Sequence, residues 1–278
     1  MGGGVLLLLW IAVVAVLHAW HPLTEATAFV LATGGLFGAI GAADDLLSVR
    51  KRRSLGLSAT AKLVLSTAAT VFLFLLFHDA LSVPARIPFT DLSLTLPPVA
   101  VFALTWIVFL ATTNGMNLTD GLDGLAPGIA ILILIGALLL SPSPTILVVV
   151  APLIASLVGF LWINAHPAGL FLGDVGSFFI GGVIASLCLV NGTAFFLPIL
   201  AGVLVLEVGS VILQVVLFRT TGRRLFRMSP LHHSFEPANE EEREHILPAF
   251  CWPEEKVTIR FWILEAGFVG LALMASRF

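Results

Sequence analysis

Residues 114–124, Asn-Gly-Met-Asn-Leu-Thr-Asp-Gly-Leu-Asp-Gly, form a polar stretch between two long apolar runs at 96–113 and 125–140. Two other polar segments, 41–45 and 164–177, stand in the same setting, and each also carries aspartate. A carboxylate at the end of a membrane helix is costly if it enters the lipid, so its presence needs a reason. We therefore expect all three segments to open on the same side of the molecule and to share one ligand.

The composition places the chain among membrane proteins. Of its 278 residues, 58% are hydrophobic and 11% are charged, whereas a soluble domain carries about 25% charged residues. An apolar stretch of roughly 20 residues spans a bilayer. Such stretches are predicted at 5–20, 27–43, 59–77, 96–113, 125–140, 145–163, 177–190, 194–218 and 257–276. The predicted fold is therefore all-α, a polytopic transmembrane bundle of about nine spans in one domain over residues 1–278.

The basic residues predict the orientation of the bundle. With nine spans, the segments that fall on one side are 44–58, 114–124, 164–176 and 219–256. All Lys and Arg residues except Arg86 and Arg277 lie in these segments or at the helix ends that border them. Because basic loops face the cytoplasm, we expect the N-terminus and the three aspartate-bearing segments there, and the C-terminus outside.

The residue types on this predicted cytoplasmic face suit a phosphorylated ligand. Two asparagines, a histidine pair and five carboxylates gather there among Lys and Arg residues; the carboxylates are Asp44, Asp45, Asp120, Asp123 and Asp174. Carboxylate oxygens suit Mg²⁺, which usually takes one or two of them together with substrate phosphates. Basic side chains suit phosphate oxygens. The combination predicts a Mg²⁺-dependent site for a phosphorylated substrate at the membrane surface.

Simpler explanations stay open for several of these residues. A lone aspartate at a helix start is often an N-cap, so capping explains Asp120 or Asp123 as well as ligand binding does. The Asp44–Asp45 pair can also balance the basic run at 50–53. Glu207 lies inside an apolar run, where a charge is functional by default; a hydrogen bond to a neighbouring helix is the alternative.

Three motifs in fixed order resemble one enzyme superfamily, the polyprenyl-phosphate N-acetylhexosamine-1-phosphate transferases. Residues 114–126 resemble its signature, 41–45 its Asp-Asp motif, and 171–177 its third-aspartate motif. Further motifs are similar to the bacterial phospho-N-acetylmuramoyl-pentapeptide transferases of glycosyltransferase family 4 type; these lie at 207–214, 226–236 and 260–263. The resemblance covers essentially the whole chain. It implies transfer of phospho-MurNAc-pentapeptide from its UDP carrier to undecaprenyl phosphate, giving lipid I and UMP.

The resemblance also implies roles for individual residues. The metal-ligating candidates are Asp174, which matches the Mg²⁺-binding aspartate, and Asn117, which matches the asparagine beside it; Phe171 lies where an aromatic ring stacks on uracil. The catalytic candidates are Asp44, Asp45, Asp174, His232 and His233. The substrate-binding candidates are Lys62, Asn117, Asp120, Asp123 and Phe171. For the Asp44–Asp45 pair, which matches residues that bind or deprotonate the lipid phosphate, we favour positioning over proton removal.

The chain departs from the family pattern in four places. It begins Met1-Gly2-Gly3, which resembles the tail of the family's Thr-Pro-Thr-Met-Gly-Gly motif, so the resemblance implies one N-terminal helix fewer. Ser48 and Ser234 stand where the family has a lysine and a third histidine, and residues 237–251 resemble an insertion in the 219–256 loop. These changes predict weaker phosphate binding or a divergent member.

The implied partners are UDP-MurNAc-pentapeptide, undecaprenyl phosphate and membrane lipid, with Mg²⁺ as cofactor, in the bacterial cytoplasmic (inner) membrane. No nucleic acid is expected, and a homodimer is compatible with the resemblance. Two alternatives stay open. One is a related transferase that uses UDP-GlcNAc, against which the motifs at 226–236 and 260–263 argue. The other is an inactive, truncated homologue, against which the presence of all three aspartate motifs argues.

Overall fold

The computed structural model describes residues 2–51, 56–237, 244–248 and 250–277. Most of these residues are helical. The α-helices are α1 (Gly2–Leu17), α2 (Glu25–Lys51), α3 (Ala59–Leu76), α4 (His78–Leu81), α5 (Pro98–Thr119), α6 (Leu125–Leu140), α7 (Pro144–Asn164), α8 (Gly173–Val190), α9 (Leu197–Leu200), α10 (Gly202–Thr221) and α11 (Glu254–Ala275). Two 3₁₀ turns, η1 (Ala194–Phe196) and η2 (Leu231–Ser234), and a small antiparallel pair, β1 (Ala85–Arg86) with β2 (Ser93–Leu94), complete the described elements.

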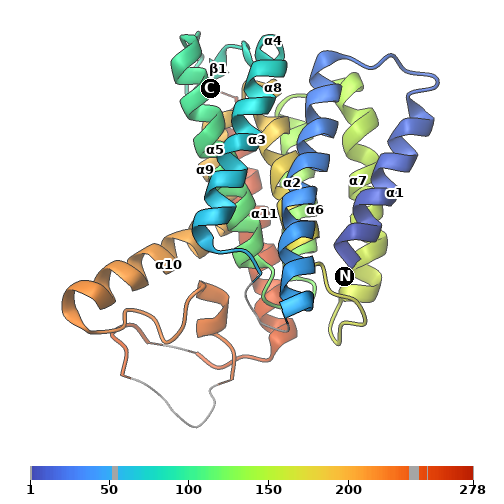
Figure 1. Cartoon of the computed structure of the whole chain (residues 1–278). Coiled ribbons are helices and arrows are strands. Elements are labelled where there is room, and N and C mark those ends of the chain that lie inside the picture. The colour runs from blue at the N-terminus through green and yellow to red at the C-terminus, as the bar shows by residue number, and fades with distance from the viewer. Residues whose placement is uncertain (1, 52–55, 238–243, 249, 278) are drawn as a thin grey trace.

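The predicted all-α membrane fold is confirmed. Within the described residues, seven helices are long and apolar enough to cross a membrane, namely α2, α3, α5, α7, α8, α10 and α11. Helices α1 and α6 are apolar but shorter, at 16 residues each. The chain is therefore a multi-pass membrane protein. The two chain ends lie at opposite ends of the helix bundle (Figure 1), while the side of the membrane that each end faces stays a prediction.

Helix α8 is the centre of the bundle, because every residue from Val175 to Val190 is buried. Helices α2 and α5 make the most extensive contacts with it among the described helix pairs. Small residues permit this close approach. A Cβ atom added to Gly41 of α2 would lie 2.1 Å from the backbone oxygen of Asp174, so the two backbones nearly touch there. The start of α8 is thereby fixed against α2.

All three aspartate-bearing segments are more helical than predicted. Helix α2 continues through Asp44 and Asp45 to Lys51, α5 includes Asn117, and α8 begins at Gly173, so that it includes Asp174. The predicted loop boundaries were wrong, because hydropathy ends a run at its first polar residue, whereas backbone hydrogen bonding continues past it. The polar side chains are consequently held on helix ends. Of the segments expected to be loops, residues 52–55, 238–243 and 249 lie outside the described residues; the last seven belong to the predicted insertion.

The predicted continuous helix at 194–218 was also wrong. The chain runs there through η1 and α9, bends at Ala201, whose φ and ψ are −116° and 48°, and only then enters α10. Helix α10 slants outward from the rest of the bundle (Figure 1). Its Val203 N–H donates to Oε2 of Glu265 in α11 at 2.9 Å. A backbone group freed by a helix break inside a membrane needs such a partner.

Candidate functional site

The polar helix ends meet at one end of the bundle, the lower end in Figure 1, where α2 and α5 finish and α3, α8 and α11 begin. Hydrogen bonds between residues far apart in sequence join these ends, as described below. The expectation that the three aspartate-bearing segments open on the same side of the molecule is therefore confirmed for the described structure. The sharing of one ligand stays a prediction.

A lysine stands between two carboxylates at the centre of this region. Lys62 Nζ of α3 lies 2.6 Å from Asp174 Oδ2 and 3.2 Å from Asp44 Oδ2. On the other side of the carboxylate, Asn117 Nδ2 donates to Asp174 Oδ1 at 2.8 Å and to the Ser177 hydroxyl at 3.1 Å. Four helices thus supply what we call the central cluster: Asp44, Lys62, Asn117 and Asp174. The sequence predicted all four residues, and the structure brings them together.

The central cluster has a fixed geometry and carries excess negative charge. Two carboxylates share one ammonium, and Asp44 Oδ1 also accepts the Leu57 N–H at 2.6 Å. Charge-assisted hydrogen bonds of this kind are roughly twice as strong as neutral ones. The side chains of Lys62 and Asp174 are 21% and 22% exposed, so a ligand arriving from solvent can reach them.

The adjacent Asp45 has a different environment from Asp44. Its Oδ1 accepts the N–H of Asp174 at 3.2 Å, and its Oδ2 accepts the N–H of Val175 at 3.2 Å. Asp120 Oδ2 accepts the preceding N–H, that of Gly173, at 3.1 Å. The first N–H groups of a helix lack partners within it and favour negative charge. Two carboxylates from α2 and from the end of α5 therefore cap α8 and fix the backbone that carries Asp174.

Helix capping was one of two explanations open for Asp120. The structure shows that Asp120 caps α8, which is distant in sequence, and not the helix that follows it. The helix that follows Asp120, α6, has Gly124 as its N-cap and receives no side-chain cap. Burial raises the pKa of Asp120 to about 7, and the nearby charges of Asp174 and Asp45 act in the same direction. The Gly173 N–H and the charge of His232 oppose this rise. Asp120 therefore lies near both the start of α8 and the histidine pair.

The two predicted histidines lie against the turn between α5 and α6. A Cβ atom added to Gly121 would be 2.2 Å from Nε2 of His232 and 3.2 Å from Nε2 of His233. The two imidazole rings are 4.1 Å apart between centroids. Each ring has its own carboxylate, because His232 Nδ1 lies 3.2 Å from Glu207 Oε1 and His233 Nδ1 lies 2.9 Å from Glu236 Oε1.

The loop that carries the histidines is closed by its own polar groups. The Ser234 hydroxyl donates to the Met228 carbonyl at 2.6 Å and accepts the Met228 N–H at 3.3 Å. Arg227 donates to the carbonyls of His233 and Glu236. Ser234, which departs from the family's third histidine, is buried and serves here to hold the loop together.

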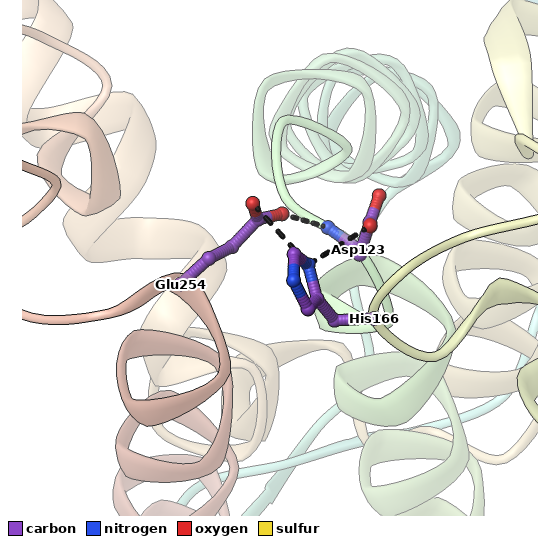
Figure 2. A group of neighbouring side chains, drawn as sticks. All are labelled: Asp123, His166 and Glu254. Carbon is purple, nitrogen blue, oxygen red and sulfur yellow. Dashed lines mark hydrogen bonds and ion pairs between the residues drawn. The ribbon is translucent and has the colours of Figure 1, made fainter.

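Asp123 belongs to a separate network, which Figure 2 shows. Its Oδ2 lies 3.2 Å from His166 Nδ1 and accepts the Ala168 N–H at 2.8 Å, and its own N–H donates to Glu254 Oε1 at 2.8 Å. His166 also lies 3.5 Å from Glu254 Oε2. One imidazole and two carboxylates are thus close enough to hold a metal ion. Without a metal, the same three side chains contact one another directly and join the turn after α5, the loop after α7 and the start of α11.

Sequence reasoning missed His166 and Glu254 as partners of Asp123. Glu254 is 131 residues away from Asp123, and no local pattern connects them. Phe171, the predicted uracil-stacking residue, is 66% exposed just before the start of α8. The loop before it is anchored by Asn164, which accepts the Gly124 N–H and donates to the Leu170 carbonyl. Phe171 is therefore presented to solvent on a fixed loop.

The central cluster fits a hard divalent cation. Its carboxylate oxygens are the ligands that Mg²⁺ prefers, and the Lys62 ammonium already occupies the space where Asp44 and Asp174 converge. Asn117 directs its amide nitrogen at Asp174, so in this arrangement it orients that carboxylate. Any ligation of a metal by Asn117 would use its amide oxygen.

Comparison with known proteins places this site in a family. Residues 27–192 match the family model described as glycosyl transferase family 4. All four residues of the central cluster lie within that range. The chain belongs to glycosyl transferase family 4, and it is an enzyme of that type.

The similar curated proteins point to one group within the family. The phospho-N-acetylmuramoyl-pentapeptide-transferase of Rubrobacter xylanophilus is 35% identical over 289 residues, covering 100% of this chain and 83% of the relative. The proteins with the same name from Moorella thermoacetica and Desulforamulus reducens are 43% and 37% identical, covering 98% and 99% of this chain and 83% and 81% of the relatives. The resemblance identified from the motifs is thus confirmed.

Proposed function

We propose that this enzyme transfers phospho-MurNAc-pentapeptide from UDP-MurNAc-pentapeptide to undecaprenyl phosphate, releasing UMP and leaving lipid I in the membrane for peptidoglycan synthesis. The central cluster is the observation that carries the proposal. It combines carboxylates, an ammonium and an amide at the end of a membrane bundle. A water-soluble diphosphate and a lipid phosphate can meet only at such a boundary. The names of the relatives favour this donor over UDP-GlcNAc and over an inactive homologue.

The proposed reaction is a substitution at phosphorus. An oxygen of undecaprenyl phosphate forms a bond to the β-phosphorus of the nucleotide sugar. The bond from that phosphorus to the oxygen bridging to UMP breaks, and UMP leaves with the electron pair. No proton has to be removed when the lipid phosphate is already dianionic, and its second pKa lies near 6.

The chain's own residues support this chemistry by position and charge. Lys62 and His233, whose side chains are partly exposed, supply donors for phosphate oxygens, and such electrostatic stabilisation is the largest kind of contribution in phosphoryl transfer. Both oxygens of Asp45 accept backbone N–H groups, which favours a positioning role for it over proton removal. Asp44 differs, because one of its oxygens faces the Lys62 ammonium while the other accepts the Leu57 N–H. Phe171 presents an exposed ring for the nucleobase.

Mg²⁺ is the proposed cofactor, and Asp174 with Asp44 would hold it. When bound, the ion would neutralise the diphosphate and stabilise the departing UMP. The proposed location is the bacterial cytoplasmic membrane, with the central cluster on the cytoplasmic side where nucleotide sugars are made. The basic residues around this end of the bundle support that orientation.

The test measures UMP release by purified protein in detergent with UDP-MurNAc-pentapeptide and undecaprenyl phosphate. We expect release that stops with EDTA and falls at least about 100-fold with Asp174→Asn, because the variant weakens the charge that would hold the cation. Asp91→Asn, in an exposed segment at the other end of the bundle, serves as the matched control and retains activity.

Two results would contradict the proposal. One is no UMP release by folded wild-type protein in the presence of Mg²⁺. The other is equal or faster release when UDP-GlcNAc replaces the muramoyl donor, which would favour the related transferase instead.

A further inference from the structure

The contact between Glu207 and His232 stands outside the central cluster. Glu207 lies in α10, and both side chains are 0% exposed. Oε1 of Glu207 is 3.2 Å from His232 Nδ1, an ion-pair distance that falls outside hydrogen-bond geometry, and it accepts the His232 backbone N–H at 3.3 Å. One carboxylate oxygen thus meets both the ring and the backbone of the same histidine.

This burial has to be compensated. Burying an ionised group without a partner is strongly unfavourable, and a carboxylate within a membrane helix is functional by default. Oε2 of Glu207 has no hydrogen-bond partner among the described residues. The favourable contacts of this carboxylate are therefore concentrated on His232.

The opposite edge of the His232 ring packs on the Gly121 turn. Nε2 is buried, has no hydrogen-bond partner within the described part of the chain, and lies where Gly121 leaves room for it. The charged or titratable groups around the ring are Glu207 from α10, the neighbouring His233 and Asp120 of the α5–α6 turn. The ring therefore connects a membrane helix to the turn that bears Asp120.

We propose that Glu207 is a positioning residue, which holds His232 as an imidazolium with its Nε2–H packed on the Gly121 turn, so that its positive charge lies behind the turn where the substrate's diphosphate binds. This inference rests on the proposed function. The physical logic is that of a carboxylate orienting a histidine, where the partner of one ring nitrogen decides what the other nitrogen presents. The Glu207 carboxylate favours the charged ring, and only the charged ring is a donor at both nitrogens.

The experiment compares wild type with Glu207→Gln, which keeps the size of the side chain and removes its charge. We expect kcat for UMP release to fall roughly 10- to 100-fold. Loss of the partner that orients a metal-binding histidine has effects of this size. The high-pH limb of the pH–rate profile should move to lower pH, because the imidazolium has lost its counter-charge. Glu207→Asp keeps the charge and should retain more activity than Glu207→Gln.

Two comparisons separate positioning from a structural role. Ser210→Ala alters a buried group on the same helix, whose hydroxyl bonds the Glu207 carbonyl at 2.7 Å, and should keep the wild-type pH profile. In a His232→Gln background, Glu207→Gln should cost less than threefold more, since coupled residues do not act additively.

The outcomes are distinct. Wild-type kcat and pH profile in Glu207→Gln, or a full additive loss in the double variant, would overturn the inference while the transferase activity of the wild type stands. If Glu207→Gln alone does not fold, the double variant, which buries no unpaired imidazolium, is expected to fold; its failure to fold would also overturn the inference. An inactive wild type would instead contradict the proposed function itself.

Discussion

The acidic residues of the site divide into two kinds by the groups that they touch. Asp44 and Asp174 face a lysine ammonium; Asp44 is buried, whereas Asp174 is partly open to solvent. Asp45 and Asp120 accept backbone N–H groups of α8. These bonds use the backbone of α8, and Gly173, whose φ is +73°, leaves the space that Asp45 occupies, because a Cβ there would lie 2.9 Å from Asp45 Oδ2. The neighbours Asp44 and Asp45 consequently act on different parts of the site.

Asp120 gives this division a measurable pH dependence. Its pKa rises from an ordinary 3.8 to about 7 in the folded protein. The folded state thus binds the proton more tightly than the unfolded state, so its contribution to stability is full below about pH 4 and is lost as the pH rises through about 7. The size of this contribution is at most roughly 4 kcal/mol.

We therefore expect the melting temperature in detergent with EDTA to fall between about pH 4 and pH 7, and to fall less steeply for Asp120→Asn. Asparagine keeps an oxygen for the Gly173 N–H but does not titrate. Asp91→Asn, which changes an exposed aspartate, should leave the wild-type slope unchanged. Equal slopes for wild type and Asp120→Asn would show that this carboxyl does not titrate as described.

At the scale of elements, the contact between α2 and α8 sets the position of Asp174. The Cβ of an alanine at Gly41 would lie 2.1 Å from the Asp174 backbone oxygen, and backbone cannot move aside as a flexible side chain can. We expect Gly41→Ala to displace the start of α8 and to reduce UMP release at least about 100-fold, because a displacement of about 1 Å can cost that much.

Gly35→Ala is the matched control for this packing prediction. It lies on the same helix, and a Cβ there meets nothing within 4 Å. Its activity and melting temperature should stay close to those of the wild type. If Gly41→Ala behaves like Gly35→Ala, the close approach of the two helices is not needed for the site.

The sequence predicted an element correctly where hydropathy alone determined its bounds. The run at 125–140 coincides with α6, because glycine or serine bounds it at both ends and no charge interrupts it. The central cluster was also predictable, since each member lies in a motif. The break at Ala201 was not, because it depends on Glu265 from another helix. Likewise, the pairing of Asp123 with Glu254 was not predictable, because only the fold brings together two residues that are 131 positions apart in sequence.

At the scale of the whole molecule, the orientation in the membrane is the main untested prediction. The chain ends lie at opposite ends of the bundle (Figure 1), and the basic residues favour the central-cluster end as cytoplasmic. We expect alkaline phosphatase fused after residue 278 to be active and a green fluorescent protein fused there to be dark. Fusions after Gly222 should give the opposite pair of results. Phosphatase activity at residue 222 and none at 278 would reverse the orientation.

The bond between Val203 and Glu265 has a consequence for how the protein is made. A ribosome builds the chain from its N-terminus, so Val203, just after the helix break at Ala201, is made 62 residues before the Glu265 carboxylate that accepts its N–H. Until then, the nascent chain holds an open backbone group in α10, and α11 later brings an acidic side chain into lipid at a cost of roughly 2.5–3.5 kcal/mol. The Glu265 carboxylate of α11 accepts the free N–H of α10, and that N–H gives the carboxylate a partner. The last two long helices therefore have to enter the membrane together. Chains that end before α11 are therefore expected to be degraded and not to accumulate as shorter working enzymes.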